Sequence, residues 1–462
     1  MTVMHSIFHE YCKDAGHTST SRSSRTPTGD ARHPPRDELD GMDSNRCAAL
    51  HNAIYEHGWI NSGRTAESFI EQTMPLWEHL DAEMREKLHP SLQAFLREAR
   101  TLLGYGQHTD FSYNVRGLMI SFNKDWYDPD PNRLLTLYGT YMAMATTLDG
   151  LVYDQHLHLA TMNFDVTDEL ELYPAQPWRK LEDILTVWIE MIQRSKIRKV
   201  PSAGTEMTPW KAVSWTSQDL EECVELWGMI VETVERKMEL ETTEALIGLL
   251  DAATLDAARI SAEGFTQNFI LRARKPRFKF VAPALRIPTV EEFIDQPFTF
   301  APKPQGLDSG DTPPILMFRS DELPHTADLT GFNYPHAGSA AIVQECPCGL
   351  YLDHCDPDTP LPFEDGCRLV LPFKLDGGFA MQGDSTPVEG YDTVLQLGLN
   401  PYNVRHPLPF QAWLESVYHN IEDGKWSVDA HGVAGGIDVW KQADTEDGWQ
   451  DYFTSLGPGV HW

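Results

Sequence analysis

From about residue 46 to residue 275, apolar residues recur every three or four positions, the spacing of a helix with one buried face. The clearest case begins at Thr216, a suitable N-cap, with Asp219 in the first turn. The apolar side consists of Leu220, Cys223, Val224, Trp227, Ile230, Val231, Val234 and Met238, and the opposite side carries Glu221, Glu222, Glu225, Glu232 and Glu235. We therefore predict one continuous helix over 216–238, with Trp227 buried and the glutamates in solvent.

Other stretches of the same region show a weaker helical spacing. Residues 65–103 are expected to form several short helices, because Pro75 and Pro90 interrupt the apolar pattern. Further helices are predicted over 133–152, 180–198 and 243–271. The last of these is followed by the basic residues Arg272, Arg274, Lys275, Arg277 and Lys279, which suit the negative end of a helix dipole and could also bind an anionic substrate.

The pattern changes after Pro276, where frequent prolines disfavour helix and short apolar runs alternate with turn residues. Residues 340–343, 368–373, 379–382 and 393–399 are such runs. We predict an α+β protein with a disordered tail at 1–45, a helical region at 46–275 and a β-rich, jelly-roll-like region at 276–410. An aromatic-rich segment at 411–462 is expected to follow, with a short helix at 410–420.

Composition narrows the classes of function. Of the 462 residues, 41% are hydrophobic and thirteen are Trp, which is enough for a substantial core. The formal net charge of −31 argues against binding to nucleic acid or to an anionic membrane surface. Seven cysteines in a long chain, no secretory leader and no apolar stretch of about 18 residues indicate a cytoplasmic protein with reduced thiols and a small-molecule substrate.

The densest group of potential metal ligands lies between Cys346 and Asp356. Two imidazoles and one carboxylate can hold Fe(II) on one face and leave positions open for oxygen and co-substrate. Here His354 and Asp356 form a His-x-Asp pair at the expected end of a strand, and His406 follows after three further predicted runs. We therefore take His354, Asp356 and His406 as candidate iron ligands.

This order of features resembles the non-haem iron(II), 2-oxoglutarate-dependent oxygenases over about residues 332–410. In that family a His-x-Asp pair is followed by a Gly-Gly-apolar strand, here Gly377 to Met381, and then by the distal His. The resemblance implies 2-oxoglutarate as co-substrate, bound by an Arg that follows the distal His. No Arg follows His406 in this chain, so Arg405 or Lys374 would have to take that role.

Two other metal sites compete with the iron hypothesis. Cys346, Cys348, Cys355 and Cys367, together with His354, could supply the tetrahedral set of ligands that zinc prefers. Alternatively, Asp154, His156 and His158 would share one face of a strand, as in metal-dependent amidohydrolases.

We therefore predict a non-haem iron-dependent dioxygenase that acts on a small molecule of specialised metabolism. Two other classes of function remain open: a metal-dependent hydrolase centred on Asp154, His156 and His158, and a non-catalytic module that binds a small molecule or a protein.

Overall fold

The structure is a computed structural model of the chain. It describes residues 41–102, 110–113, 115–122, 130–140, 150–163, 178–199, 210–241, 243–298, 313–321, 325–327, 344–352, 363–380, 394–395 and 409–452. Most of the predicted disordered tail at 1–45 therefore lies outside the described residues. Residues 44 and 45 instead belong to the first turn of a helix.

Short helices and turns follow one another between residues 44 and 102, and the prolines decide where they break. In order the elements are α2 (Ser44–Asn61), α3 (Ala66–Gln72), β1 (Thr73–Pro75), η1 (Leu76–His79), α4 (Ala82–Glu86), α5 (Pro90–Glu98) and β2 (Arg100–Leu102). Pro75 ends β1 before η1, and Pro90 is the first residue of α5, where its missing N–H costs no hydrogen bond. The prediction that these two prolines divide the segment is confirmed.

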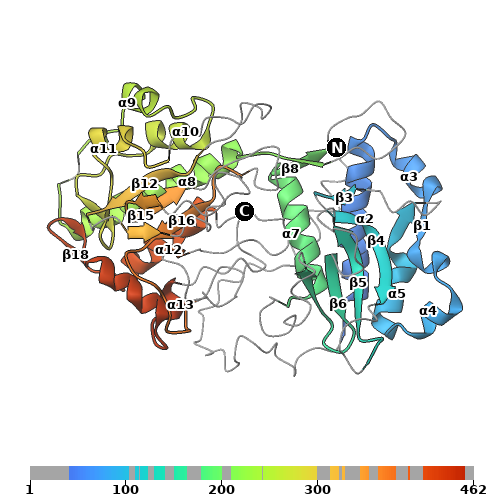
Figure 1. The fold of residues 1–462 in the computed structure, drawn as a ribbon. Coiled ribbons are helices and arrows are strands. Elements are labelled where there is room, and N and C mark those ends of the chain that lie inside the picture. The colour runs from blue at the N-terminus through green and yellow to red at the C-terminus, as the bar shows by residue number, and fades with distance from the viewer. Residues whose placement is uncertain are drawn as a thin grey trace. The chain divides into compact units, whose positions relative to one another are not determined.

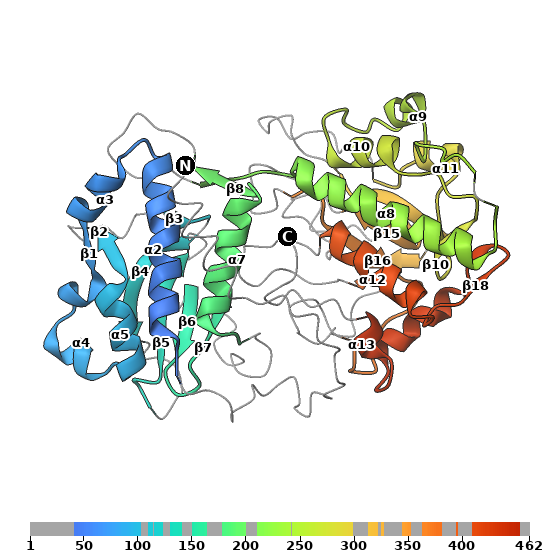
Figure 2. The same ribbon diagram turned by 180° about the vertical axis from the view of Figure 1, so that it is seen from behind.

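A five-stranded antiparallel sheet follows, in the order β3-β4-β5-β6-β7. Its strands are β3 (Asp110–Ser112), β4 (Val115–Phe122), β5 (Leu134–Thr140), β6 (Gly150–Asp154) and β7 (Leu159–Asn163). Helices α2 and α7 (Leu181–Gln193) lie side by side on one face of this sheet (Figure 2). Contacts of the Trp188 ring on α7 with Phe111 and Tyr138 join the helix to the strands.

The predicted helix at 133–152 is therefore wrong, because this segment supplies β5 and β6. Leu134, Leu135 and Leu137 on β5 and Leu151 to Tyr153 on β6 are all buried, so both faces of the two strands are covered. An apolar run that is buried on every side carries no period that separates strand from helix. The region at 46–275 is consequently mixed rather than helical, and the protein is α+β throughout its described length.

Helix α8 (Ser217–Lys237) matches its prediction closely. Thr216 is the N-cap, and its hydroxyl accepts a hydrogen bond from the Asp219 N–H while the Asp219 carboxylate accepts one from the Thr216 N–H, at 3.1 and 2.8 Å. Such a capping box satisfies two N–H groups that have no partner within the helix. The helix is continuous, and Trp227 is buried as expected.

One glutamate of α8 departs from the predicted pattern. Glu235 is buried, and its carboxylate lies 2.6 Å from Arg274 and 3.0 Å from Arg277. Burial alone would raise the pKa of Glu235, but these guanidinium groups outweigh it and hold the pKa below its usual value. Arg272 and Arg274 also pair with Glu221 and Glu232, so these members of the basic run bind the acidic side of α8.

The helix predicted over 243–271 is two shorter helices, α9 (Ala252–Ala257) and α10 (Phe265–Arg272). After α9 the backbone turns through Arg259, which has a φ of +60°, and the N–H groups of Arg259 and Ile260 donate back to Asp256 and Leu255. This pair of bonds is the Schellman arrangement, which ends a helix. Gly264 then caps α10, so the apolar spacing continues across a break that it does not reveal.

The second sheet has eight strands in the order β17-β16-β15-β12-β11-β10-β19-β18 (Figure 1). They are β10 (Phe280–Ala282), β11 (Leu285–Arg286), β12 (Ile315–Ser320), β15 (Gly349–Leu352), β16 (Cys367–Val370), β17 (Val394–Leu395), β18 (Val428–Asp429) and β19 (Gly432–Val433). Every neighbouring pair is antiparallel except β10 and β19. The described part of 277–410 is thus rich in antiparallel strands, as predicted, with the short helix α11 (Val290–Ile294) between β11 and β12. The strand expected from Gly377 to Met381 is not formed by residues 377–380, where the N–H groups of Gly377, Phe379 and Ala380 donate to the Asp444 carboxylate.

Helices α8 and α12 (Phe410–Glu422) run side by side across one face of this sheet (Figure 2). The ring of Phe318 on β12 stacks on Trp227 of α8 at 5.4 Å and on Trp413 of α12 at 5.7 Å. The predicted helix at 410–420 is confirmed by α12. The elements β8 (Ile197–Lys199), β9 (Trp210–Ala212), β13 (His325–Ala327), β14 (Gln344–Cys346), η4 (Ile437–Asp444) and α13 (Trp449–Tyr452) complete the description.

The part of the chain that the structure describes contains no helix long and apolar enough to cross a bilayer. In the segment after residue 411, Trp426, Trp440 and Tyr452 form an aromatic cluster with ring centroids 5.4 to 6.1 Å apart. Trp426 and Trp440 of this aromatic-rich segment are thus part of the core, and the half-buried Tyr452 packs against it.

The core beneath α2 contains a fully enclosed imidazole. His51 Nδ1 lies 2.8 Å from the Tyr138 hydroxyl and Nε2 lies 2.9 Å from the Arg100 carbonyl oxygen, while Phe111 stacks on the ring. The carbonyl requires a proton on Nε2, so Nδ1 accepts from Tyr138. Burial lowers the pKa of His51 to about 4.

We expect His51 to make the protein less stable in mild acid. The unfolded chain takes up a proton at His51 near its usual pKa of 6.5, whereas the folded chain does so only near 4, so the free energy of unfolding falls as pH falls between these values. The loss attributable to His51 is about 3 kcal/mol by pH 4. Urea unfolding of wild type and His51→Gln between pH 7 and 4 measures this difference in slope. The exposed His419→Gln variant should keep the wild-type slope, and an unchanged slope in His51→Gln would contradict the assignment.

Candidate functional site

His354, Asp356, His406 and Arg405 lie outside the described residues, but the strands next to them do not. Strand β15 ends at Leu352, two residues before His354, and Leu352 pairs with Cys367 of β16. On the other side, Leu352 lies opposite Ile315 of β12. The His-x-Asp segment therefore begins at the edge of the eight-stranded sheet where β15 ends, which we call the candidate edge.

The first described residue after His406 also lies at this edge. Pro409, three residues after His406, forms an isolated bridge with Gly366, the residue before Cys367. Paired Cα atoms lie about 5 Å apart and consecutive ones about 3.8 Å, so Leu352 and Pro409 are separated by at most about 15 Å. In sequence, His354 thus follows Leu352 and His406 precedes Pro409. These two described residues lie near each other at the candidate edge.

The direction of β17 agrees with this arrangement. Val394 and Leu395 pair with Val370 and Leu369, so β17 runs antiparallel to β16 and in the same direction as β15. Lys374 instead follows Val370, at the opposite end of β16, and is exposed. Of the two cations considered for a co-substrate, Lys374 thus follows β16 at the edge opposite to the candidate edge, and Arg405 lies outside the described residues.

Cys348 and Cys367 cannot both belong to the thiolate site of the zinc alternative. The side chains of Cys348 and Cys367 are both buried. Cys348 precedes Gly349, which pairs with Val370, whereas Cys367 pairs with Leu352 at the other end of the ladder. At about 3.3 Å per residue, the two Cα atoms are roughly 13 Å apart, too far for both sulfurs to lie about 2.3 Å from one zinc ion. Cys355 and the side chain of Cys346 lie outside the described residues.

Asp154, His156 and His158 do not share a strand face, because β6 ends at Asp154 and the histidines belong to the turn before β7. The Asp154 carboxylate accepts hydrogen bonds from the N–H groups of His156 and Leu157, at 2.7 and 3.0 Å, and from Arg133. An aspartate that closes a turn in this way is a structural residue.

The two histidines of this turn have separate partners. His156 Nε2 lies 3.1 Å from an Asp130 carboxylate oxygen, and His158 Nδ1 lies 3.1 Å from the Tyr153 hydroxyl. Across the described ranges as a whole, no group of three or more His, Cys, Asp or Glu side chains is arranged to hold a metal ion. The ligand set expected of the hydrolase is therefore not formed by these three residues.

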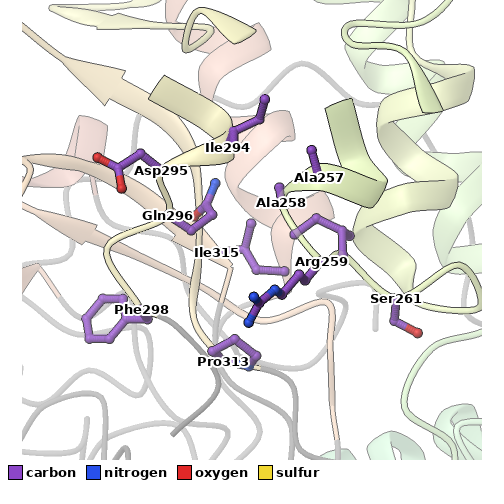
Figure 3. Close-up of a pocket in the computed structure, with 11 residues that line it drawn as sticks. Ala257, Ala258, Arg259, Ser261, Ile294, Asp295, Gln296, Phe298, Pro313 and Ile315 are labelled. Atoms are coloured by element: carbon purple, nitrogen blue, oxygen red, sulfur yellow. The ribbon is translucent and has the colours of Figure 1, made fainter. Parts of the chain in front are cut away.

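A pocket of about 240 Å³ lies at the candidate edge, and none of the sequence patterns predicted it. Ile315, which pairs with Leu352, forms part of its wall, and Phe298 joins the wall to Tyr351 of β15 through an edge-to-face ring contact at 5.8 Å. The remaining walls come from the segment after α9 and from the end of α11 (Figure 3). Segments distant in sequence meet here, so no local pattern could have predicted the pocket.

A buried ion cluster lies next to Gly366, also at the candidate edge. Lys196 Nζ, which is fully buried, lies 2.7 Å from an Asp365 oxygen and 3.0 Å from an Asp219 oxygen. Burial alone would lower the pKa of Lys196, but the carboxylates of Asp365 and Asp219 outweigh it and raise the pKa. Asp365 precedes Gly366, and its carbonyl oxygen accepts from the Phe410 N–H at 2.6 Å, so the cluster fixes the backbone that bridges to Pro409.

Comparison of the chain with protein families, with curated proteins and with solved structures found no match in any of the three.

Proposed function

We propose that the protein is a non-haem iron(II) oxygenase acting on a small metabolite, with His354, Asp356 and His406 as the iron ligands. The observation that carries the proposal is the backbone pairing at the sheet edge, Leu352 to Cys367 and Gly366 to Pro409. It brings Leu352 and Pro409, the described residues that flank the proposed ligands in sequence, to within about 15 Å of each other, which is compatible with three ligands that meet at one iron. Fe(II) bound there would activate oxygen.

Two further observations support this function. The pocket beside Leu352 offers a partly apolar space near the described residue after which the proposed ligands begin, and such a space would shield a small substrate from water. Arg405 adjoins His406 in sequence and could bind the carboxylate of a co-substrate such as 2-oxoglutarate. In a jelly-roll-like arrangement a second sheet would face the first, and β13 and β14 form a separate strand pair that could belong to it.

Metal analysis tests the proposal directly. Full-length protein is loaded anaerobically with Fe(II), freed of excess metal, and its iron measured by plasma mass spectrometry. We expect about one iron per chain in wild type and in the exposed His419→Ala variant, and a loss of at least tenfold in affinity in His354→Ala, Asp356→Ala and His406→Ala. Circular dichroism and urea unfolding establish that each variant is folded.

Other outcomes would redirect the assignment. Zinc retained after loss of His406 but released by Cys355→Ala would favour a thiolate site, and zinc released by His156→Ala would favour the hydrolase. Protein that binds neither metal would be a non-catalytic binding module or a metal-free enzyme. Oxygen uptake on addition of 2-oxoglutarate, absent in His406→Ala, would identify the co-substrate.

A further inference from the structure

The pocket beside the sheet edge has mostly apolar walls and one cation. Ile315 and Phe298 are buried, Pro313 lies beside them, and Ile294 of α11 closes one side with 41% of its surface exposed. Figure 3 shows the Arg259 side chain reaching from the end of α9 into the space between Ile315 and Pro313. Arg259 is exposed to solvent, and its charged group is presented to a small space with both apolar and polar walls.

The guanidinium of Arg259 makes no hydrogen bond or ion pair within the part of the chain that the structure describes. Asp295 also lines the pocket, but its carboxylate points away from Arg259 (Figure 3). By contrast, Arg194 binds Glu222, and Arg286 binds Glu292 and Asp321. An unpaired guanidinium is thus available to a ligand.

Backbone conformation alone does not explain Arg259. It occupies the left-handed position at the end of α9, with a φ of +60°, where glycine is preferred. Ser195 and Glu239 occupy similar positions after α7 and α8, with φ of +61° and +56°, so the chain tolerates several side chains in this conformation. What distinguishes Arg259 is the pocket into which its side chain extends.

The chemistry of the pocket selects its ligand. A guanidinium binds a carboxylate through two parallel hydrogen bonds, and apolar walls favour a hydrocarbon body over hydration. The Gln296 side chain is held in place, because its amide donates to the Phe293 carbonyl oxygen and accepts from the Leu316 N–H. A volume of about 240 Å³ is below the roughly 300–1,000 Å³ of pockets for drug-sized ligands.

We propose that this pocket binds a small monocarboxylate, with its carboxylate on Arg259 and its hydrocarbon chain against Ile315, Phe298 and Ile294. The proposal does not depend on bound iron, because every residue that it uses lies outside the proposed metal ligands. Since Ile315 pairs with Leu352, such a ligand would lie beside the sheet edge from which the His-x-Asp segment departs.

Titration of full-length, metal-free protein with hexanoate tests the proposal by NMR or calorimetry, with hexan-1-ol and inorganic phosphate as comparison ligands. We expect hexanoate to bind with a Kd in the millimolar range or below, and hexan-1-ol to bind at least about tenfold more weakly, because it lacks the charge. Arg259→Gly should lose about tenfold or more in affinity for hexanoate, and Arg259→Lys should fall between, since lysine cannot form the paired bonds.

Matched variants separate ligand binding from helix capping. Glycine suits the left-handed position, so Arg259→Gly should fold at least as stably as wild type. Glu239→Gly makes the same backbone change after α8 and should leave hexanoate binding unchanged. Ile294→Ser, at an exposed wall position, should weaken hexanoate but not acetate.

The proposal is overturned by hexanoate affinity that is unchanged in Arg259→Gly, which would leave Arg259 a helix-capping residue. Phosphate binding as tight as hexanoate binding would overturn the monocarboxylate assignment in favour of a general anion site. Because these measurements use metal-free protein, loss of iron in His354→Ala bears on the proposed oxygenase and not on this pocket.

Discussion

Replacement of Lys196 by methionine is expected to lower the free energy of unfolding by about 3–5 kcal/mol, because it removes one partner of a buried ion cluster. The ammonium of Lys196 lies 2.7 Å from Asp365 and 3.0 Å from Asp219, and none of its surface is exposed. Asp219 keeps Arg194 at 3.5 Å and the N–H of Thr216, whereas Asp365 loses its cation in a dry environment.

A double-mutant cycle isolates the interaction. Lys196→Met combined with Asp365→Leu should recover most of the stability lost in Lys196→Met alone, because an apolar pair replaces the uncompensated charge. Lys211→Met, on exposed β9, is the control and should change the free energy of unfolding by less than about 0.5 kcal/mol. Urea unfolding of wild type, Lys196→Met, Asp365→Leu, the double variant and the Lys211→Met control measures these values. Additive effects of the two single substitutions would show that Lys196 and Asp365 are not coupled.

The pH dependence of this contribution has a definite sign. The pKa of Lys196 is raised above its usual 10.5 in the folded protein, so its stabilising effect is fully present below that value. It is lost only as pH rises through the higher folded pKa. The difference between wild type and Lys196→Met should therefore be constant from pH 6 to pH 9. The same interaction fixes Asp365 beside Gly366, so its loss should also disturb the backbone bridge to Pro409.

The elements that could be predicted from sequence are those whose determinants are local. Helix α8 carries its own N-cap, an amphipathic period and a solvent-facing side over most of its length. Strands β5 and β6 carry no such information, since residues 134 to 139 and 150 to 154 are buried on both faces and their partners lie elsewhere in the chain. The break after α9 is equally hidden, because Arg259 adopts a conformation for which glycine would have been the signal.

The same contrast between local and tertiary determinants applies to the candidate site. His-x-Asp is visible in the sequence, but the bridge between Gly366 and Pro409 that brings the two flanks together depends on tertiary structure. Buried charge is harder still to predict. Lys196 and Glu235 look like solvated residues, and only the partners supplied by Asp365 and Arg274 make their burial possible.

Truncation of Trp227 to alanine is expected to cost about 3–5 kcal/mol of folding stability, since it leaves a large cavity between α8 and the eight-stranded sheet. Only 1% of the Trp227 surface is exposed. Its ring stacks on Phe318 at 5.4 Å and meets Phe269 edge-on, and its indole N–H donates to the Arg274 carbonyl oxygen at 2.7 Å. One side chain thus joins α8, α10 and β12.

Two further substitutions separate packing from hydrogen bonding. Trp227→Phe keeps most of the ring contacts but leaves the Arg274 carbonyl without its donor, so a smaller loss of about 1–3 kcal/mol is expected. Met229→Ala, on the same helix with 37% of the Met229 surface exposed, should change stability by less than about 0.5 kcal/mol. Urea unfolding followed by far-ultraviolet circular dichroism compares the three variants with wild type.

A loss below 1 kcal/mol in Trp227→Ala would mean that α8 is not anchored to the sheet through this residue. Because β12 carries both Phe318 and Ile315, a large loss should be accompanied by weaker hexanoate binding at the pocket, whereas Met229→Ala should leave that binding intact.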